Sequence, residues 1–417
     1  MNKRLYHVVS VISGILIMSI LSGCEKSSVS EDEIASYYET NKQNSLNKLF
    51  PMGLMSGSLN TTDTETKPSF HIVHISDAHL SPWSSNNSTR KPSNLLEAVQ
   101  FANEPTAGVN VTVDTGDHIG NSIQTTRTEA LSYLDAYADA LYTGNKIPTL
   151  ACTGNHDANM LDVKQHPEYA LSKMDMYNHL TSKTNYPIHT EGIQNYYYAD
   201  VVNPAGGVVR IIALDVMDQE GTAYDAQFYA VLSQRQIDWF CHTALKENMT
   251  ENHSVIVLIH YPLSNNDEIK SYVSSEFVYS WKLIPDIIEA FRSKHPLTAK
   301  YRNRFDASDS VAVNVSFKDA PGEFICYMGG HIHTYLNYEI EGFNNLNPAL
   351  PKQIMLIANN LSPSDKSPKS PISRNSVGLL NNTFNIYSID TARKIIRVFF
   401  FGATGYYIQN VIELNYL

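Results

Sequence analysis

The sequence predicts an α/β fold, in which helices cover the faces of β-sheets. From Phe70 onward, short apolar runs rich in β-branched residues alternate with segments that place apolar residues at helical spacing. Nearly every one of these runs ends in a cluster of polar residues. Hydrophobic residues make up 43% of the 417 residues and charged residues 18%, which is typical of a soluble globule. This composition excludes wholesale disorder and a protein with many membrane spans.

The apolar runs are predicted as strands, and the last two of them as a closing β-hairpin. The strands are expected at residues 71–75, 109–113, 149–152, 208–214, 255–259, 324–328 and 354–357, and the hairpin at 384–389 and 395–401.

Two helices are predicted with most support. Ser233 followed three residues later by Gln236 is the signature of a capping box, in which each residue binds the backbone of the other. The apolar residues after it share one helical face: Ile237, Phe240, Cys241, Ala244 and Leu245. A second helix is expected around residues 131–141, with Leu131, Leu134, Ala138 and Leu141 on its apolar face.

The N-terminal segment differs from the rest of the chain. Lys3 and Arg4 precede an apolar run over residues 8–21, which is too short for a comfortable membrane span and is typical of a secretory signal. The run ends in Leu21-Ser22-Gly23-Cys24, which resembles the lipidation site of bacterial lipoproteins. We therefore expect a signal peptide over 1–23, a lipid on Cys24, a polar tether over 24–68 and one domain over 69–417. An ordinary signal peptide with a chance cysteine is the alternative.

This organisation predicts a location in the bacterial cell envelope, periplasmic or surface-exposed, with the lipid anchor holding the protein on a membrane. The formal net charge is −11, and an acidic surface repels polyphosphate backbones, so nucleic acid is an unlikely main partner. Three further cysteines cannot form a disulfide framework, and each lies in an apolar segment, so buried structural thiols are expected at Cys152, Cys241 and Cys326.

Five short segments carry the residues suited to chemistry, because each follows an apolar run and offers oxygen or imidazole ligands at a turn. They are Asp77-Ala78-His79, Gly116-Asp117-His118, Gly154-Asn155-His156-Asp157, His260, and Gly330-His331-Ile332-His333. Taken singly each is a weak signal, since a lone histidine after a strand is more often structural than a ligand.

In this order the five segments resemble the calcineurin-like metallophosphoesterase family, whose signature is D-x-H, G-D, G-N-H-[DE], H and G-H-x-H. The resemblance covers about residues 70–401. It implies a four-layer αββα sandwich of two mixed β-sheets flanked by helices, with a metal site at the C-terminal ends of the strands. The family usually has an apolar residue after the second aspartate, where this chain has His118. We expect His118 to face solvent without a role, and a supporting or substrate-binding role is the alternative.

The resemblance implies two divalent metal ions. A small anionic bridge between them is required, and a carboxylate such as that of Asp117 can offer one oxygen to each ion. One site is completed by Asp77, His79 and His333, and the other by Asn155, His260 and His331. The i, i+2 spacing of His331 and His333 predicts an extended backbone with both rings on one side. Nitrogen and oxygen ligands suit Mn, Fe, Zn or Ni, and the sequence does not choose among them.

The same resemblance implies a phosphate-ester hydrolase acting on a small-molecule substrate. The ions would activate a water for attack at phosphorus. The catalytic residue is His156, expected to donate a proton or hydrogen bond to the leaving oxygen. Asp157 is expected to have a supporting role, orienting the turn or the imidazole of His156. The non-enzyme alternative is a metal-binding surface lipoprotein, which would be expected to have lost His156 or a bridging ligand.

The scarcity of basic residues favours a phosphodiester over a monoester, because dianionic monoesters are commonly held by Arg or Lys. No Arg or Lys lies within ten residues of His331 or His333. Near the other motifs only Lys67, Arg127, Lys146, Lys164 and Lys270 come that close in sequence. Arg90, Arg302 and Arg304 could still fold over the site. A phosphomonoesterase of the same fold is the alternative.

Overall fold

The computed structural model describes the greater part of the chain after residue 67. The described residues are 68–80, 92–120, 125–160, 166–218, 231–264, 282–302, 310–340, 350, 352–358, 361, 382–402 and 412–416. The predicted signal peptide, the tether and Cys24 lie outside these residues. None of the helices within the described ranges is long and apolar enough to cross a membrane.

Six strands form the first sheet, in the order β14-β13-β12-β1-β2-β3. They are β14 (Ile412–Asn415), β13 (Ile395–Gly402), β12 (Thr383–Asp390), β1 (Phe70–Ile75), β2 (Val111–Asp114) and β3 (Thr149–Ala151). The three N-terminal strands run parallel, and the C-terminal strands pair antiparallel on the free side of β1. The sheet is therefore mixed.

The second sheet also has six strands, in the order β10-β11-β9-β6-β5-β4. They are β10 (Leu336–Ile340), β11 (Gln353–Ile357), β9 (Glu323–Gly329), β6 (His253–Leu258), β5 (Val208–Ala213) and β4 (Tyr197–Val202). The four central strands are parallel and the two outer ones antiparallel to their neighbours.

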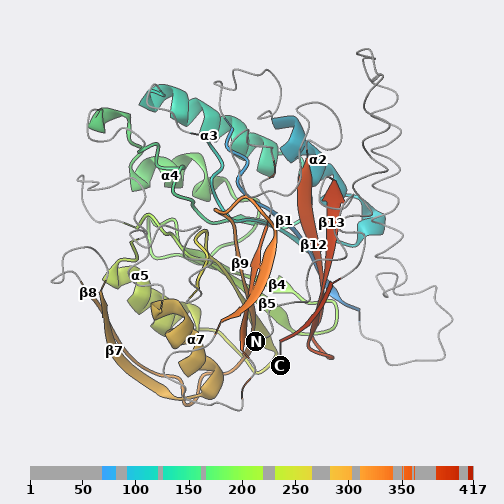
Figure 1. Cartoon of the computed structure of the whole chain (residues 1–417), viewed down its shortest axis with the longest axis vertical. Helices are drawn as coiled ribbons and strands as arrows, with labels where there is room; N and C mark the ends of the chain where they lie inside the picture. The colour runs from blue at the N-terminus through green and yellow to red at the C-terminus, as the bar shows by residue number, and fades with distance from the viewer. Residues whose placement is uncertain are drawn as a thin grey trace, which may run out of the picture.

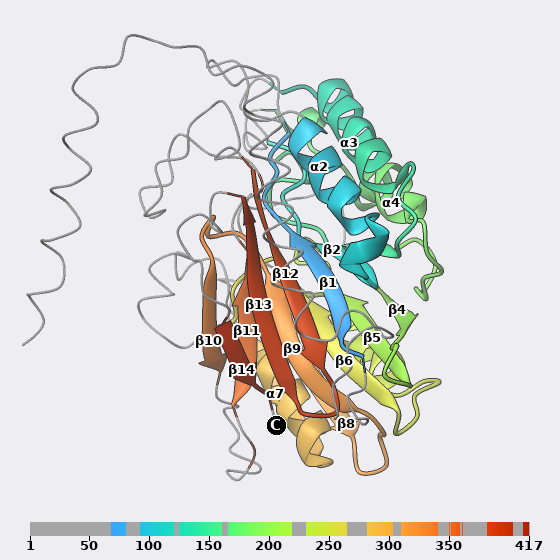
Figure 2. The same cartoon turned by 90° about the vertical axis from the view of Figure 1, so that its right-hand side faces the viewer.

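The two sheets pack face to face, with helices on their outer faces (Figures 1 and 2). On the first sheet lie α2 (Pro92–Ala102), α3 (Arg127–Tyr142) and α4 (Lys173–His179), and on the second α5 (Gln234–Trp239) and α7 (Leu283–Ser293). Short helical turns are η2 (Pro105–Ala107), η3 (Pro167–Tyr169), η4 (Thr181–Lys183) and the π-helix η5 (Phe240–Ala244), and a separate ribbon pairs β7 (Pro296–Arg302) with β8 (Ser310–Ser316). The predicted four-layer αββα sandwich is confirmed.

The side chains of β1 alternate between two packed interfaces, one between the sheets and one beneath the helices. Phe70 and Ile72 belong to the core between the sheets, whereas Val73 and Ile75 pack with the helices outside. All four are fully buried. Because successive side chains of a strand point to opposite faces, a strand covered on both sides reads as a continuous apolar run.

Each predicted strand overlaps an observed one, and the β12–β13 hairpin is confirmed by its register, which pairs Thr383 with Gly402 and Asp390 with Ile395. The prediction omitted β4, β10 and β14, which lie at sheet edges, together with the β7–β8 ribbon. Edge and ribbon strands carry polar residues on an open side, so the apolar run that marked the central strands is absent.

The helix predictions hold with one correction. Ser233 caps α5 by accepting from the backbone N–H of Gln236 at 3.1 Å. The Gln236 side chain does not return to the cap, because it pairs with the backbone N–H of Asp215 at 2.8 Å and the carbonyl at 2.9 Å. Complete capping boxes are found instead at the start of α3, between Thr126 and Glu129, and at the start of α4, between Ser172 and Asp175. The three cysteines Cys152, Cys241 and Cys326 are buried free thiols, as predicted.

Candidate metal centre

The predicted ligands come together where the two sheets meet. Asp77, Asp117 and Asn155 follow the C-terminal ends of the parallel strands β1, β2 and β3, and His260 and His331 follow β6 and β9 of the other sheet. The turns are joined by backbone hydrogen bonds, from the Asp77 N–H to the Gly116 carbonyl at 2.9 Å and from the Gly330 N–H to the His260 carbonyl at 3.0 Å. The carboxylate of Asp77 ties the two sheets together, since it accepts from the His331 N–H at 3.0 Å.

Five ligand candidates have left-handed backbone conformations, which side chains other than glycine rarely adopt. Their φ angles are 52° for Asp77, 48° for His79, 56° for Asp117, 73° for His331 and 56° for His333. Such conformations cost on the order of 1 kcal/mol or more each and persist where the surrounding structure imposes them. The extended backbone expected for His331 and His333 is therefore wrong: the turn curls back on itself, with the Ile332 N–H bound to the Gly330 carbonyl at 2.9 Å.

Two glycines permit the close approach of these turns. A Cβ atom on Gly330 would overlap the Ser76 hydroxyl and the Asp77 carboxylate, and one on Gly154 would overlap the backbone nitrogen and carboxylate of Asp117. Any larger residue would push the ligand turns apart. The glycines predicted to allow close approach therefore do so at the centre of the site.

The first ligand group consists of Asp77, His79, Asp117 and His333, whose ligand atoms lie within 4.8 Å of one another. The Nε2 atoms of His79 and His333 are 2.9 Å apart. Asp77 Oδ1 is 3.3 Å from His333 Nε2, and Asp117 Oδ2 is 3.7 Å from His79 Nε2.

The second group consists of Asp117, His260 and His331, again within 4.8 Å. The amide oxygen of Asn155 completes it, at 3.0 Å from both His260 Nε2 and His331 Nδ1. The Nδ2 of Asn155 is buried and has no hydrogen-bond partner among the described residues, so the amide is oriented for its oxygen. His260 Nδ1 lies 2.7 Å from the Thr115 carbonyl, an arrangement that fixes the ring and directs Nε2 into the group.

Asp117 is the member that the two groups share. Its Oδ2 faces both groups, at 3.7 Å from His79 Nε2 and 3.3 Å from His260 Nε2. Its Oδ1 accepts the backbone N–H of His156 at 2.8 Å. Oδ2 is therefore the oxygen that lies toward both groups, while Oδ1 is held by the neighbouring turn.

The electrostatics of the site favour cations. Burial alone would raise the pKa of Asp77, but the hydrogen bond to His333 and the charges of His333 and His260 lower it well below its usual range. Burial opposes protonation of His260, yet the carboxylates of Asp117 and Asp77 raise its pKa to about 9. The pKa of His331 is lowered to about 3 by burial and then by the charge of His260.

These residues fit divalent ions. Two carboxylates, one amide oxygen and four imidazoles converge in two groups, and nitrogen and oxygen donors of this kind suit borderline ions of the first transition row. The ring nitrogens of His79 and His333 lie 2.9 Å apart with a carboxylate oxygen beside them, close enough together to be ligands of one ion. A chemically suitable place for metal thus exists on each side of Asp117.

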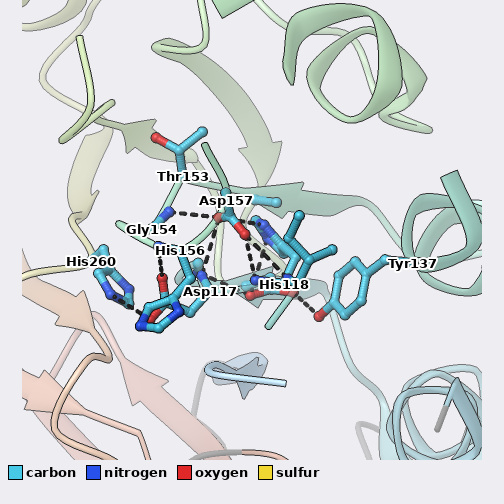
Figure 3. Close-up of polar contacts among 12 residues, drawn as sticks. Asp117, His118, Tyr137, Thr153, Gly154, His156, Asp157 and His260 are labelled. Carbon is cyan, nitrogen blue, oxygen red and sulfur yellow. Dashed lines mark hydrogen bonds and ion pairs between the residues drawn. The ribbon is translucent and has the colours of Figure 1, made fainter. Parts of the chain in front are cut away.

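His156 lies beside the first group, with its ring edge-on to that of His79 at a centroid distance of 4.7 Å. It comes from the turn after β3 (Figure 3). The residue is only partly buried. Burial lowers the pKa of His156, and the charge of Asp117 opposes this effect.

Asp157 supports the turn, as predicted. It accepts backbone hydrogen bonds from Gly154 at 2.7 Å and from His118 at 2.7 Å, and the imidazole that it holds is that of His118, with Nδ1 2.8 Å away. The expectation that His118 faces solvent is wrong, because its exposed fraction is 0%. Burial opposes its protonation, but the carboxylates of Asp157 and Asp114 outweigh this effect and raise the pKa of His118 to about 9.

Sequence reasoning missed the residues behind the ligands. Thr115 orients His260 through a backbone carbonyl, a contact that no sequence motif reveals. Asp114 and Tyr137 lie behind His118, and Tyr137 donates to Asp114 (Figure 3). A buried carboxylate directly at the end of β2 is a signal that could have pointed to Asp114.

The basic residues considered above as phosphate ligands are only partly described. Arg127 pairs with Asp175 of α4, and Lys146 is exposed. Arg302 ends β7 and is exposed. Lys67, Arg90, Lys164, Lys270 and Arg304 lie outside the described residues.

Comparison with known proteins gives one family. The family model described as calcineurin-like phosphoesterase matches residues 70–335, a span that includes every predicted metal ligand. A solved structure described as "Structure of PhoD" is similar over 84% of this chain and 72% of that chain, with 9% sequence identity and a TM-score of 0.40. No curated protein matches the chain.

Proposed function

The chain belongs to the calcineurin-like phosphoesterase family and is a metal-dependent phosphoesterase, and we propose that it hydrolyses phosphodiesters with two divalent ions. The observation that carries the proposal is the position of Asp117, whose Oδ2 faces two separate ligand groups. One group alone would hold a single ion. A carboxylate shared by two groups supports a pair of ions with one bridge between them.

The chain's own residues would hold the ions from both sheets. Asp77, His79 and His333 would bind one ion with Asp117, and Asn155, His260 and His331 the other. Ions in these places supply Lewis acidity toward phosphate oxygens and make a water nucleophile available at neutral pH. The Thr115 carbonyl holds His260 by accepting from its Nδ1, and the His156 N–H holds Asp117 by donating to its Oδ1, before any substrate arrives.

His156 is the residue best placed to act on the leaving group. Its ring lies against His79 at the border of the first group, and its backbone is tied to the bridging carboxylate. When the bond from phosphorus to the leaving oxygen breaks, negative charge builds on that oxygen. A hydrogen bond or proton from His156 would stabilise the charge, which is the usual task of a positioned acid.

The preference for a diester rests on charge. Two divalent ions and the carboxylates of Asp77 and Asp117 leave a net charge of roughly +2, enough to hold a monoanionic phosphodiester. A monoester is largely dianionic at neutral pH and is commonly held by an additional Arg or Lys. Of the cations near the motifs, Arg127 is paired with Asp175 on α4. We therefore expect a phosphodiester or another monoanionic ester as the substrate.

A hydrolysis screen tests the reaction and the ester type together. The purified protein would be assayed with and without added Mn²⁺ against bis-p-nitrophenyl phosphate and p-nitrophenyl phosphate. We expect Mn²⁺-dependent turnover with the higher kcat/KM on the diester. A kcat/KM at least tenfold higher on the monoester with the same metal would contradict the diester preference. A tenfold ratio corresponds to about 1.4 kcal/mol in transition-state binding. No turnover on either substrate class would favour a metal-binding surface lipoprotein.

We also propose that the protein is attached to a membrane in the bacterial cell envelope through a lipid on Cys24. The order of basic residues, apolar run, small residues and cysteine at the N-terminus supports this. Cys24→Ala is expected to leave the protein unlipidated and uncleaved. Incorporation of a radiolabelled fatty acid measures this, and label that still enters the variant would show that the anchor lies elsewhere.

A further inference from the structure

A line of buried polar side chains lies directly behind the bridging carboxylate. It runs from Tyr137 of α3 through Asp114 at the end of β2 and His118 to Asp157 of the turn after β3. Figure 3 labels Tyr137, His118 and Asp157. Each of the four is at most 2% exposed. We call these four side chains the His118 bridge. Buried polar groups are costly unless they are paired, so a fully buried line of this kind calls for a reason.

Asp157 joins two segments that are far apart in the sequence. Its Oδ1 accepts from the backbone N–H groups of His118 at 2.7 Å and Ile119 at 3.3 Å. Its Oδ2 accepts from the N–H groups of Gly154 at 2.7 Å and Asp117 at 3.2 Å. One carboxylate thus holds the turn that carries Asn155 and His156 against the loop that carries Asp117.

The imidazole of His118 fixes the position of that carboxylate. Its Nδ1 is 2.8 Å from Asp157 Oδ2, and its Nε2 is 3.5 Å from Asp114 Oδ1. Asp114 is itself held, because Oδ1 accepts the Gly116 N–H at 3.1 Å and Oδ2 accepts the Tyr137 hydroxyl. The ring also packs against that of Tyr137 at a centroid distance of 4.9 Å. The His118 ring is therefore hydrogen-bonded through Nδ1 and packed on one side, while Nε2 lies within ion-pair distance of Asp114 and has no hydrogen-bond partner among the described residues.

The His118 bridge is connected to the two metal groups through Asp117. The carboxylate of Asp117 accepts the His156 N–H with one oxygen and faces both ligand groups with the other. A shift of the turn relative to the loop would therefore move His156 and the bridging oxygen at the same time. Reactive groups must be held within about 0.5 Å of the productive geometry, so such a shift is expected to cost rate.

We propose that His118 is a positioning residue for the reaction: from Nδ1 it holds Asp157, and through Asp157 it sets the bridging oxygen of Asp117 and the ring of His156. The role rests on the proposed function, because it describes how that site is kept in shape. Hydrogen-bond partners behind metal ligands typically contribute about 10- to 100-fold in metal affinity or activity. His118 is expected to contribute in the same range.

Three variants separate the two ring nitrogens. His118→Asn keeps a donor near the place of Nδ1 and loses the one toward Asp114, whereas His118→Gln keeps a donor nearer the place of Nε2. His118→Leu removes both. The matched control is His71→Leu, since His71 is a buried histidine near the start of β1, at the opposite end of the strand from the ligand turns, and its ring has no hydrogen-bond partner among the described residues.

The effect of each variant is measured in the full-length protein loaded with Mn²⁺, by kcat and KM and by electron paramagnetic resonance. We expect kcat to fall about 10- to 100-fold in His118→Leu and His118→Gln, with KM within about threefold, because positioning acts on the chemical step. The electron paramagnetic resonance signal of the coupled Mn²⁺ pair should change in the same two variants. His118→Asn should restore both kcat and the signal to near the wild-type values, and His71→Leu should leave both unchanged.

Several results would overturn the proposal. One is a His118→Leu variant with a lower melting temperature but wild-type kcat and spectrum, which would show a merely structural role. Another, decisive even if His118→Leu fails to fold, is equal behaviour of His118→Asn and His118→Gln. Failure of the proposed function is distinguishable, because wild-type protein would then lack turnover or a coupled pair. In that event Mn²⁺ affinity by equilibrium dialysis tests His118 alone, and equal affinity in wild type and His118→Leu would refute its role.

Discussion

The two ligand groups of the site share Asp117 but differ in charge. The first group contains a second carboxylate, that of Asp77, whereas the second has the neutral amide of Asn155 at the corresponding place. Each group has one partly exposed histidine, His333 in the first and His331 in the second, so exposure does not separate them. The difference in charge indicates that the first group would hold its ion with more ligand charge than the second.

This asymmetry implies an order of binding. More ligand charge raises the affinity for a divalent ion, so the group with Asp77 is expected to bind first and more tightly. The second group depends on geometry, as the hydrogen bond from His260 to the Thr115 carbonyl shows. Substitutions at three places should therefore affect metal binding and activity differently. They are the shared Asp117, His156 beside the first group, and the pair Asp77 and Asn155, in which the two groups differ.

The largest effect is expected from Asp117→Asn, which removes the one carboxylate among the described residues that belongs to both groups. An amide cannot bridge two cations as a carboxylate does, so metal should be lost or misplaced in both groups. Because Lewis-acid catalysis is worth several kcal/mol, activity should fall by about 10⁴-fold or more. Elemental analysis after gel filtration measures the metal content, and undiminished metal in this variant would contradict the shared role.

His156→Ala should spare both groups and still impair the reaction. His156 contacts the ring of His79 but is not among the ligand atoms that converge. We expect wild-type metal content with a rate about 10² to 10⁴ lower, the usual contribution of a positioned acid. The loss should be smaller for substrates whose leaving group needs no proton. Wild-type turnover of a poor leaving group would remove His156 from the mechanism.

The asymmetry itself is tested by exchanging the residues that differ. Asn155→Asp adds a carboxylate to the second group, and we expect it to raise the affinity of the weaker site by roughly tenfold. Asp77→Asn removes the charge from the first group and should weaken the tighter site. Titration calorimetry with Mn²⁺ should show two separate binding phases in the wild type. In each variant the two Mn²⁺ affinities should become more similar, so the two phases should converge. A single phase in the wild type would mean that the groups bind alike.

The smallest effect concerns pH and compares a ligand with a residue behind it. In the metal-free protein the pKa of both His118 and His260 is raised from 6.5 to about 9. A raised folded-state pKa gives stability that is fully present below pH 6.5 and is lost as pH rises through 9. The melting temperature of the metal-free protein is therefore expected to fall by several degrees over this window.

Metal should reduce that fall, because an ion displaces the proton of His260 but leaves that of His118 in place. Differential scanning fluorimetry with EDTA or with Mn²⁺ measures the two curves. In the metal-free protein, His118→Leu should make the decrease in melting temperature between pH 6.5 and 9 smaller, because it removes the contribution of the His118 protonation. A melting temperature that is flat between pH 6.5 and 9 without metal would contradict the raised pKa of both residues.

Much of the fold and the site was predictable because the signals are local. The central strands are continuous apolar runs, since both faces of each sheet are covered, and each ligand motif directly follows such a run. Edge strands such as β10 and β14 were missed because an open side admits polar residues. The backbone at His331 was wrongly expected to be extended, because spacing alone does not report a left-handed turn.

The sequence by itself determined the α/β class, the central strands and the residue types at the five ligand turns, because period-two patterns and motifs are properties of neighbouring residues. The tertiary structure decided which oxygen of Asp117 faces both groups, that His118 is buried, and that Asp157 holds it. These depend on contacts between residues 39 positions apart for His118 and Asp157, and 254 apart for Asp77 and His331. Only packing of the two sheets and their turns brings such residues within hydrogen-bond distance.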